Sequence, residues 1–237
     1  MAYANTFIRR EIKYLLSERQ TDEVLLRISS MMTEDCYSDQ TICSLYCDSA
    51  DHILARLSMD KPVYKEKLRL RAYGTPVDSS DVFLEIKKKF QGVVYKRRAE
   101  VSFAEAMGLL CNGIQPECSQ RQVLAEICHM IKRDSLAPAA AVFYDRTAFR
   151  GIDDPELRLT LDGNIRFRTD DLDLRSGTYG EPLPGQPFRI MEIKTASAIP
   201  LWLTAVLSEL EIYPGSFSKY GSVYRQLLAG NKCGATL

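Results

Sequence analysis

The chain has 237 residues, and its 46% hydrophobic content is enough for one large domain with a substantial core or for two small ones. Its 31 basic and 31 acidic side chains balance, so the net charge gives no sign of a nucleic-acid or membrane partner. The 7 cysteines include no C-x-x-C pair, and the histidines are His52 and His129, which argues against zinc and indicates reduced thiols. Without a signal peptide or an apolar span of membrane length, we expect a cytoplasmic protein with no direct membrane insertion.

The N-terminal part alternates strands and helices. The patterns predict a strand over 6–16, a helix over 17–32, a strand over 41–48 and a helical turn over 51–57. In the first strand, Glu11 and Lys13 share the polar face. Thr21 is a candidate N-cap of the first helix, and the helical turn carries Arg56.

The stretch over 64–73 has the most regular charge pattern in the chain. A strand directs successive side chains to opposite faces. One face would therefore carry Lys65, Lys67, Arg69, Arg71 and Tyr73, and the other Leu68, Leu70 and Ala72. Like charges in a row repel one another, so such a row is tolerated only in water or where an anion neutralises it.

Two further segments repeat this pattern. Residues 82–90 place Glu85 and Lys87 on the face opposite to an apolar row, and residues 93–101 place Lys96 on a basic face. The Gln91-Gly92 pair between them predicts a tight hairpin. We therefore expect two adjacent antiparallel strands that both present basic rows.

The rest of the chain adds helices and shorter strands. The patterns predict helical structure over 102–134, capped by Ser102 and with a second amphipathic run over 122–131. They also predict strands over 139–146, 157–162, 165–168 and 189–195, a loop over 170–187, and helices over 200–210 and after 214–220. Gly163-Asn164 is predicted to be a turn. The polar faces of these strands carry Tyr144 with Arg146, Arg158 with Thr160 and Asp162, and Glu192 with Lys194.

Seven or more strands with one apolar and one charged face permit two assemblies. In a sandwich, the apolar faces form the core and the charged faces meet water. In a barrel, the charged faces line the interior and helices cover the apolar exterior. Each predicted helix has an apolar stripe that needs a partner, and the apolar strand faces supply it. We therefore expect an α+β fold, an antiparallel β-barrel of about eight strands with helices packed on the outside.

The interior of this barrel would be lined by cations and filled with water, because unpaired buried charges are costly. Its basic side chains would be Lys13, Lys67, Arg69, Arg71, Lys87, Lys96, Arg146, Arg158 and Lys194. Arg binds phosphate oxygens in pairs and Lys acts as a compact charge, so this set suits a chain of phosphates. The carboxylates Glu11, Glu85 and Glu192 indicate a hard divalent cation, Mn²⁺ or Mg²⁺.

Eight short motifs in order resemble the VTC domain, the polyphosphate polymerase branch of the triphosphate tunnel metalloenzymes in the CYTH-like superfamily. They are REIKYLL (10–16), KLRLRAYG (67–74), VFLEIKKK (82–89), YKRR (95–98), YDRTAFRG (144–151), LRLTLD (157–162), MEIKT (191–195) and SFSKYG (216–221). The resemblance implies a single triphosphate tunnel domain over 1–237. It also implies a tunnel that binds ATP and metal and moves the terminal phosphoryl group onto a polyphosphate chain.

The resemblance also implies roles for individual residues. The phosphate-binding residues would be Lys13, Arg56, Arg69, Arg71, Lys87, Lys96, Arg146, Arg158 and Lys219, with Tyr144 and Ser218 assisting. We expect the catalytic ones to be Lys13, Arg69, Arg71, Arg146 and Arg158, and further substrate contacts from Lys67 and Lys194. Glu192 would be the principal metal ligand, with Glu11 and Glu85 as further candidates. Arg9 departs from the superfamily, whose first strand reads Glu-x-Glu-x-Lys.

Other functions stay open at this point. With water as the acceptor, the same tunnel would be a metal-dependent tripolyphosphatase or nucleoside triphosphatase. Without catalysis, it would be a polyphosphate-binding sensor. Single-stranded nucleic acid needs aromatic platforms beside a basic groove, and Tyr73, Tyr95 and Tyr144 are too few and too dispersed for that. We therefore expect ATP, triphosphate or polyphosphate as ligands, and no nucleic acid.

Overall fold

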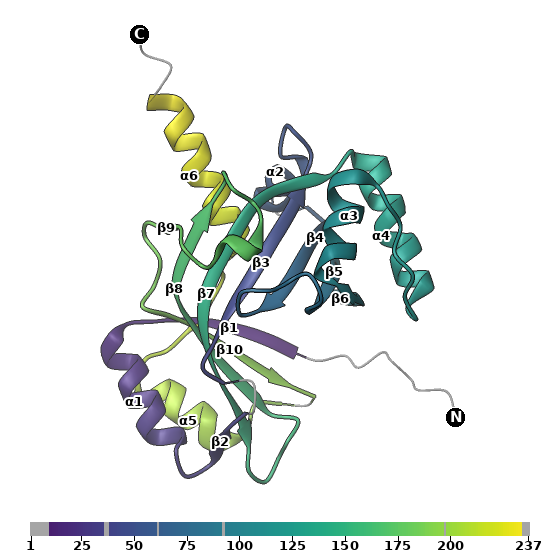
Figure 1. Cartoon of the computed structure of the whole chain (residues 1–237). Coiled ribbons are helices and arrows are strands. Elements are labelled where there is room, and N and C mark those ends of the chain that lie inside the picture. Colours follow the sequence, from purple (N-terminus) through teal and green to yellow (C-terminus); the bar gives the residue numbers. More distant parts are fainter. Residues whose placement is uncertain (1–9, 36–37, 61, 92, 197, 234–237) are drawn as a thin grey trace. The chain divides into compact units, whose positions relative to one another are not determined.

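A computed structural model describes residues 10–35, 38–60, 62–91, 93–196 and 198–233 (Figure 1). The chain divides into two compact units. Unit 1 comprises residues 1–40, 144–165 and 185–217, and unit 2 comprises residues 41–143, 166–184 and 218–237. Arg9 and the rest of the expected strand before residue 10 lie outside the described residues.

Unit 1 is built from strands and two helices. Its elements are β1 (Arg10–Leu16), α1 (Glu18–Ile28), β2 (Met32–Glu34), β10 (Arg189–Thr195), α5 (Leu201–Glu209), β11 (Pro214–Gly215) and parts of β7 (Ala137–Gly151) and β8 (Arg158–Arg168). The N-cap of α1 is Ser17, whereas Thr21 was expected, because Ser17 and Gln20 form a reciprocal capping box. Thr21 instead lies inside the helix and donates to the Ser17 carbonyl.

The helices of unit 1 cover the apolar faces of its strands. Val24 and Ile28 of α1 and Leu203 of α5 join one buried cluster with Met191 and Ile193 of β10. In Figure 1 the two helices lie next to each other beside β1 and β10. The opposite faces of these strands therefore keep the polar side chains.

Unit 2 contains the long basic strands. Its elements are β3 (Gln40–Asp48), α2 (Ile53–Met59), β4 (Tyr64–Tyr73), β5 (Asp81–Phe90), β6 (Val93–Ser102), α3 (Phe103–Asn112), α4 (Arg121–Asp134), the 3-10 helix η1 (Leu174–Ser176), β9 (Glu181–Pro182) and α6 (Lys219–Cys233), with the remaining parts of β7 and β8. The helical stretch expected over 102–134, with its second amphipathic run over 122–131, forms two helices, because Gly113 ends α3 in the left-handed region. Ser102 caps α3 as predicted. None of the helices in the described ranges is long and apolar enough to cross a membrane.

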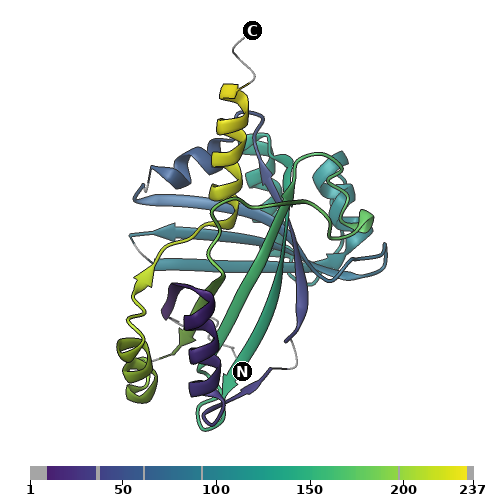
Figure 2. The same ribbon diagram turned by 90° about the vertical axis from the view of Figure 1, so that its left-hand side faces the viewer.

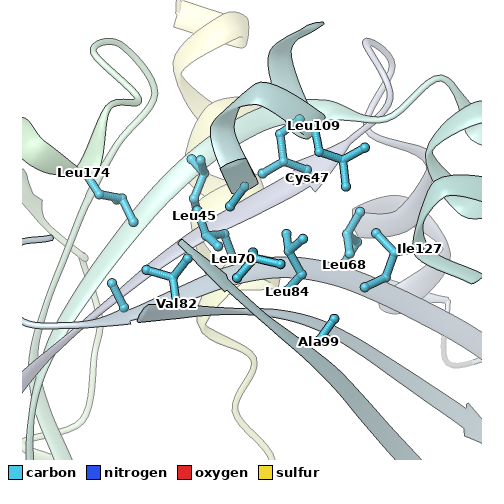
Figure 3. Close-up of a cluster of buried hydrophobic side chains, with 14 of the residues drawn as sticks. Leu45, Cys47, Leu68, Leu70, Val82, Leu84, Ala99, Leu109, Ile127 and Leu174 are labelled. Carbon is cyan, nitrogen blue, oxygen red and sulfur yellow. The ribbon is translucent and has the colours of Figure 1, made fainter. Parts of the chain in front are cut away.

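The alternation predicted for β4 is confirmed. Leu68, Leu70 and Ala72 are at most 1% exposed and belong to the main buried cluster of unit 2. Figure 3 shows Leu68, Leu70 and Leu84 of the strands in this cluster together with Leu109 of α3 and Ile127 of α4. The helices thus cover the apolar face of β4 to β6, as expected.

The expectation of a closed barrel of about eight strands is wrong for the described residues. They form one sheet of 11 strands with the order β11-β1-β10-β8-β7-β3-β4-β5-β6, in which β2 pairs with β7 and β9 with β8. This order has two ends, at β11 and β6, so the strands described do not close into a ring. The antiparallel α+β character of the prediction is confirmed, with antiparallel pairs from β1 with β10 to β5 with β6.

Gly163-Asn164 does not form the predicted turn, because β8 runs through it as one strand. Asn164 adopts a left-handed conformation with φ of 50°. The backbone of Ile165 just after it bonds to the side chain of Gln186, which accepts at 2.7 Å and donates at 3.1 Å. A Cβ at Gly163 would lie 2.4 Å from Nη1 of Arg189, so a larger residue there would have to displace that side chain. Contacts distant in sequence therefore override the local turn signal.

The loop over 170–187 is organised by one buried side chain, Arg168, and is not simply a solvated segment. The guanidinium donates at 2.6 to 3.0 Å to the backbone carbonyls of Asp171, Asp173, Gly177 and Tyr179. It also lies 4.8 Å from the ring centre of Phe143 and 4.3 Å from that of Tyr179. Four carbonyls that water would otherwise solvate are thus satisfied inside the fold.

An ion-pair network fastens α4 to the sheet. Glu66 lies on the apolar side of β4, and its side chain is 5% exposed. Its carboxylate accepts from the Tyr64 hydroxyl at 2.5 Å and pairs with Lys88 at 3.3 Å and with Arg133 of α4. Lys88 also pairs with Glu126 of α4 at 2.5 Å. Glu66 therefore links two elements that are distant in sequence.

Replacing Glu66 by Gln is expected to lower the free energy of unfolding by about 1 to 2 kcal/mol at neutral pH, because an amide cannot serve both cations. Burial opposes the ionisation of Glu66, but hydrogen bonds from Tyr64 and Arg133 outweigh it and lower its pKa below the usual 4.5. A lowered pKa stabilises the fold at pH values above the pKa that Glu66 has in the unfolded chain. This contribution is lost as the pH falls through the pKa of Glu66 in the folded protein. Urea unfolding should show a difference in the free energy of unfolding between the parent and Glu66→Gln at pH 7, and a smaller difference at pH 3. Equal differences at both pH values would contradict this assignment.

Candidate functional site

The polar face of β4 to β6 brings the predicted basic residues into rows across the strands. Lys67 lies opposite Lys87, and Lys87 lies opposite Lys96. In the neighbouring row, Arg69 lies opposite Glu85. Figure 2 shows these three strands, coloured blue to teal, side by side. Like charges directly opposite one another destabilise a sheet, so the row of three lysines suits a bound anion.

Glu85 lies among the cations of this face, with its side chain 2% exposed. Its Oε2 accepts from Nε and Nη2 of Arg69 at 2.7 Å, and its Oε1 lies 2.7 Å from Nζ of Lys96. Nη2 of Arg71 lies 3.7 Å from the same carboxylate. Burial opposes its ionisation, but the charges of Arg69, Arg71 and Lys96 hold the pKa of Glu85 far below its usual range. A charged carboxylate therefore orients three of the predicted phosphate-binding residues.

Arg71 keeps unused hydrogen-bonding capacity. It is 7% exposed, and its buried Nε has no hydrogen-bond partner among the residues described. The buried Oγ of Ser44, directly opposite on β3, is in the same state. Buried polar atoms are rarely left unsatisfied, and a site for a bound ligand or water is a common reason. This pair is therefore a candidate ligand contact.

Lys96 differs from an ordinary lysine. Burial lowers its pKa to about 7, and the charges of Arg71 and Arg69 act in the same direction, although Glu85 opposes them. The side chain is 42% exposed, so water moderates this lowering. The positive charge of this face will therefore decrease as the pH rises.

Binding of tripolyphosphate is accordingly expected to weaken between pH 6 and pH 8, because the folded protein attracts anions best while Lys96 carries its proton. In Lys96→Arg the guanidinium stays charged over this range, so a smaller pH dependence is expected. Isothermal titration calorimetry on both proteins measures this, and the ligand's own titration is common to both. The same pH dependence in both would show that Lys96 is not responsible.

Two helices add further predicted residues to unit 2. Oγ of Ser218 accepts from Nζ of Lys67 at 2.9 Å, and Lys219 begins α6. Arg56 lies on α2, where its side chain is 50% exposed and pairs with Asp51 at 3.4 Å. Figure 2 shows α2 (blue) beside α6 (yellow), and the two helices are in contact.

In unit 1, Glu192 lies between two lysines. Its side chain is 9% exposed, with Nζ of Lys13 at 2.9 Å from one oxygen and Nζ of Lys194 at 3.1 Å from the other. Glu11 lies on the same face of β1, with its carboxylate 3.9 Å from Nζ of Lys13. Lys13 and Glu192 are also directly opposite in the ladder between β1 and β10. The polar face of these strands is thus a second cluster of alternating charge.

Arg146 is held by a partner that the sequence analysis left out of the site. Its Nε and Nη2 donate to the two oxygens of the fully buried Asp162 at 2.6 and 2.8 Å. Its guanidinium also lies 5.4 Å from the ring centre of Tyr144. Burial disfavours the charged form, but electrostatic interactions with Tyr144 and with the Asp162 carboxylate, together with the Asp162 hydrogen bonds, outweigh it and raise the pKa of Arg146. Arg146 is therefore charged and fixed in orientation.

The carboxylates of the polar strand faces are the candidate ligands of a divalent cation. No group of three or more His, Cys, Asp or Glu side chains that could hold a metal ion occurs in the described ranges. Mg²⁺ and similar ions need only one or two carboxylates when phosphate oxygens and water complete the shell. Glu192 fits this role with Glu11, and Oγ1 of Thr160, opposite Glu192, is buried without a hydrogen-bond partner in the described residues. A bound cation would displace one lysine from Glu192. Glu85 fits less well, since three cations surround it.

The structure brings some predicted residues together and leaves others apart within each unit. In unit 2 the grouped residues are Arg69, Arg71, Glu85 and Lys96, next to Lys67, Lys87 and Ser218; in unit 1 they are Glu11, Lys13, Glu192 and Lys194, and Tyr144 with Arg146. Arg158 lies opposite Lys194 with an exposed side chain, and Arg56 lies on an exposed helix surface. Asp162 was missed as a partner, although it shares a strand face with Arg158.

Solved structures of other proteins have a fold similar to that of this chain. One is described as a "putative adenylate cyclase" from Bacillus halodurans, with a TM-score of 0.56, 15% identity, and coverage of 89% of this chain and 92% of that one. Another is a "putative adenylyl cyclase" from Hippeastrum, described as having a dominant triphosphatase activity. Its TM-score is 0.50 at 16% identity, and the alignment covers 91% of this chain and 94% of that one. At this identity the likeness shows the fold alone.

The family is shown by the sequence match. Residues 8–228 match the VTC domain model, so the chain belongs to the VTC domain family. It is 23% identical to vacuolar transporter chaperone complex subunit 4 of Trypanosoma brucei brucei over 92% of this chain and 34% of that protein. It is 22% identical to the subunit of the same name from Schizosaccharomyces pombe, over 90% of this chain and 36% of that protein. The chain thus spans about a third of the length of these relatives.

Proposed function

We propose that the protein is a polyphosphate polymerase-like phosphotransferase that moves the γ-phosphate of ATP onto a polyphosphate chain. The observation that carries this proposal is the basic face of β4 to β6, where Arg69, Arg71 and Lys96 surround a buried carboxylate. Such a face binds a chain of phosphates through charge-assisted hydrogen bonds. Membership of the VTC domain family and the two subunit 4 relatives support the choice of polyphosphate.

Phosphoryl transfer requires of the protein mainly that it align the reacting groups and neutralise their charge. Phosphoryl transfer passes through a loose transition state whose charge is spread over the oxygens, so fixed cations stabilise it without a nucleophilic side chain. The cations that act on the transferred group are, in this proposal, Lys13, Arg69, Arg71, Arg146 and Arg158. The groups that hold the rest of the substrate are Arg56, Lys67, Lys87, Lys96, Tyr144, Lys194, Ser218 and Lys219. The charges and hydroxyl groups of these residues replace the water that would otherwise solvate the phosphates.

A divalent cation, Mn²⁺ or Mg²⁺, would be held by Glu192 with Glu11. When bound, it would neutralise charge on the phosphate oxygens. Lys13 and Lys194 pair with the two carboxylate oxygens of Glu192 and orient them on the polar face. Glu85 remains a further candidate ligand, but its three ion pairs favour a role as a fixed counter-ion that orients Arg69 and Lys96.

The second candidate function is hydrolysis of triphosphate or nucleoside triphosphate on the same residues, with water as the acceptor. The triphosphatase activity in the description of the Hippeastrum protein favours it. Both candidates use the same cations, so the acceptor distinguishes them. We also propose that residues 1–237 act as one domain, because the family match runs from residue 8 to residue 228.

Incubation of the purified protein with ATP and Mn²⁺, followed by separation of ADP, phosphate and polyphosphate, tests the proposal. A transferase yields ADP together with polyphosphate, and a hydrolase yields ADP with free phosphate in equal amount. If neither product forms with Mn²⁺ or Mg²⁺ although tripolyphosphate binds, the protein is a sensor and the proposed transfer is wrong.

A further inference from the structure

Asp48, at the end of β3, is a buried carboxylate that joins three elements of unit 2. It is 2% exposed. Its Oδ1 accepts from the backbone N–H groups of Ser49 and Leu54 at 2.9 Å. Its Oδ2 accepts from the N–H of Ala55 at 3.0 Å and from the hydroxyl of Tyr220 at 2.8 Å. Asp48 therefore holds the first turn of α2 and, through Tyr220, the first turn of α6 against β3.

Tyr220 is positioned from two sides. It is 2% exposed, and its ring stacks on Tyr46 of β3 with centres 4.7 Å apart and planes 5° from parallel. Its hydroxyl also lies 3.4 Å from Nδ1 of His52. Tyr46 lies opposite Arg69, and its hydroxyl accepts from Nη1 of Arg69 at 3.4 Å. The stack thus connects α6 to the basic row on β4.

The first turn of α6 contacts this basic row at a second point. Oγ of Ser218 accepts from the N–H of Gly221 at 3.1 Å and from Nζ of Lys67 at 2.9 Å. A Cβ on Gly221 would lie 3.0 Å from that Oγ, so the turn is closely packed. Ser218 and Lys219, which the proposed function assigns to phosphate, therefore lie in a turn whose position is set by Tyr220 on one side and Lys67 on the other.

We propose that Asp48 and Tyr220 are positioning residues for phosphate binding, an inference that rests on the proposed function. They hold the first turn of α6 so that Ser218 and Lys219 contact the same phosphate chain as Lys67, and they hold α2, which carries Arg56. Packing alone does not need a buried carboxylate, because apolar side chains of similar volume pack as well without the cost of removing a charge from water. A fully hydrogen-bonded carboxylate instead fixes directions.

The test is the affinity for tripolyphosphate, by calorimetry, of the parent, Tyr220→Phe, Lys219→Ala and the double variant. Tyr220→Phe keeps the stacked ring and removes one hydroxyl, and the expected loss of affinity is about three- to tenfold. A positioning role predicts that this loss shrinks to less than about twofold in the Lys219→Ala background, because the charged residue of the positioned turn is gone. A purely structural role predicts the same loss in both backgrounds and would overturn the inference.

Tyr224→Phe is the matched control. Tyr224 lies on the same helix and is 6% exposed, and its ring packs against His52. Its hydroxyl removal is expected to leave the affinity unchanged, and an equal loss in both variants would also overturn the inference. If Tyr220→Phe does not fold, Asp48→Asn in the same two backgrounds answers the same question. If the parent does not bind tripolyphosphate, the proposed function is refuted. If the parent binds it, and the affinity is lost in Arg69→Ala but kept in Tyr220→Phe, only this inference is refuted.

Discussion

Replacing Arg69 by Ala is expected to weaken tripolyphosphate binding by at least about tenfold, because a charge-assisted phosphate contact contributes roughly 1.5 to 3 kcal/mol. Replacing Arg71 as well should bring the loss to about a hundredfold or more if the two contacts are independent. Both side chains lie on the polar face of β4 and contact Glu85. Calorimetric titration of the parent and both variants measures the effect.

These variants also disturb the fold, since each leaves Glu85 with one cation fewer in a buried place. The comparison should therefore be repeated in a Glu85→Gln background, where that charge is absent. There, Arg69→Ala should cost little stability but still weaken binding by about tenfold. If the loss of affinity disappears together with the loss of stability, Arg69 holds Glu85 and does not bind phosphate.

Replacing Glu192 by Gln is expected to reduce Mn²⁺-dependent turnover by about a hundredfold, because the cation's stabilisation of developing charge amounts to several kcal/mol. The same change removes the negative charge beside Lys13 and Lys194, so tripolyphosphate should bind as tightly as before, or more tightly, in the absence of metal. Turnover assayed over a range of Mn²⁺ concentrations, together with calorimetry without metal, separates the two effects.

Glu209→Gln serves as the control for Glu192→Gln. Glu209 pairs with Arg27 at 2.9 Å on the surface of the same unit, with its side chain 58% exposed, so its replacement should change neither quantity. Turnover by Glu192→Gln that keeps its full metal dependence would remove Glu192 from the metal site. Glu11 and Glu85 would then be the remaining candidates.

The strand faces could be predicted because their signal is local. In β4 the alternation of Lys67, Arg69 and Arg71 with Leu68 and Leu70 fixes which side meets the helices, and the boundaries of β4 and β10 were predicted to the residue. The two helical runs expected over 102–134 also have a local signal, and they correspond to α3 and α4. Gly113, a helix C-cap in the left-handed region, marks where α3 ends.

The remaining features depend on contacts that no local pattern contains. Asp48 and Tyr220 are 172 positions apart, and no local pattern links them. Arg168 donates to four backbone carbonyls of the loop over 170–187, although the composition of that loop predicts that it is exposed to solvent. Sheet closure was inferred from the number of strands and the helical stripes, which fix what each face packs against but not how the ends of the sheet meet. The site residues were expected from motifs, and the structure adds their counter-ions.

The most direct test of the central claim, that this chain binds a row of phosphates through its basic strand faces, is a calorimetric series with phosphate, pyrophosphate, tripolyphosphate and longer polyphosphate at fixed ionic strength. Each added phosphate reaches a further cation of the rows across β4 to β6, so the affinity should rise steadily with chain length and fall as salt is added. Citrate, which also carries several negative charges on a compact carbon skeleton, should bind much more weakly than tripolyphosphate. Equal affinity for phosphate, tripolyphosphate and citrate would contradict the account.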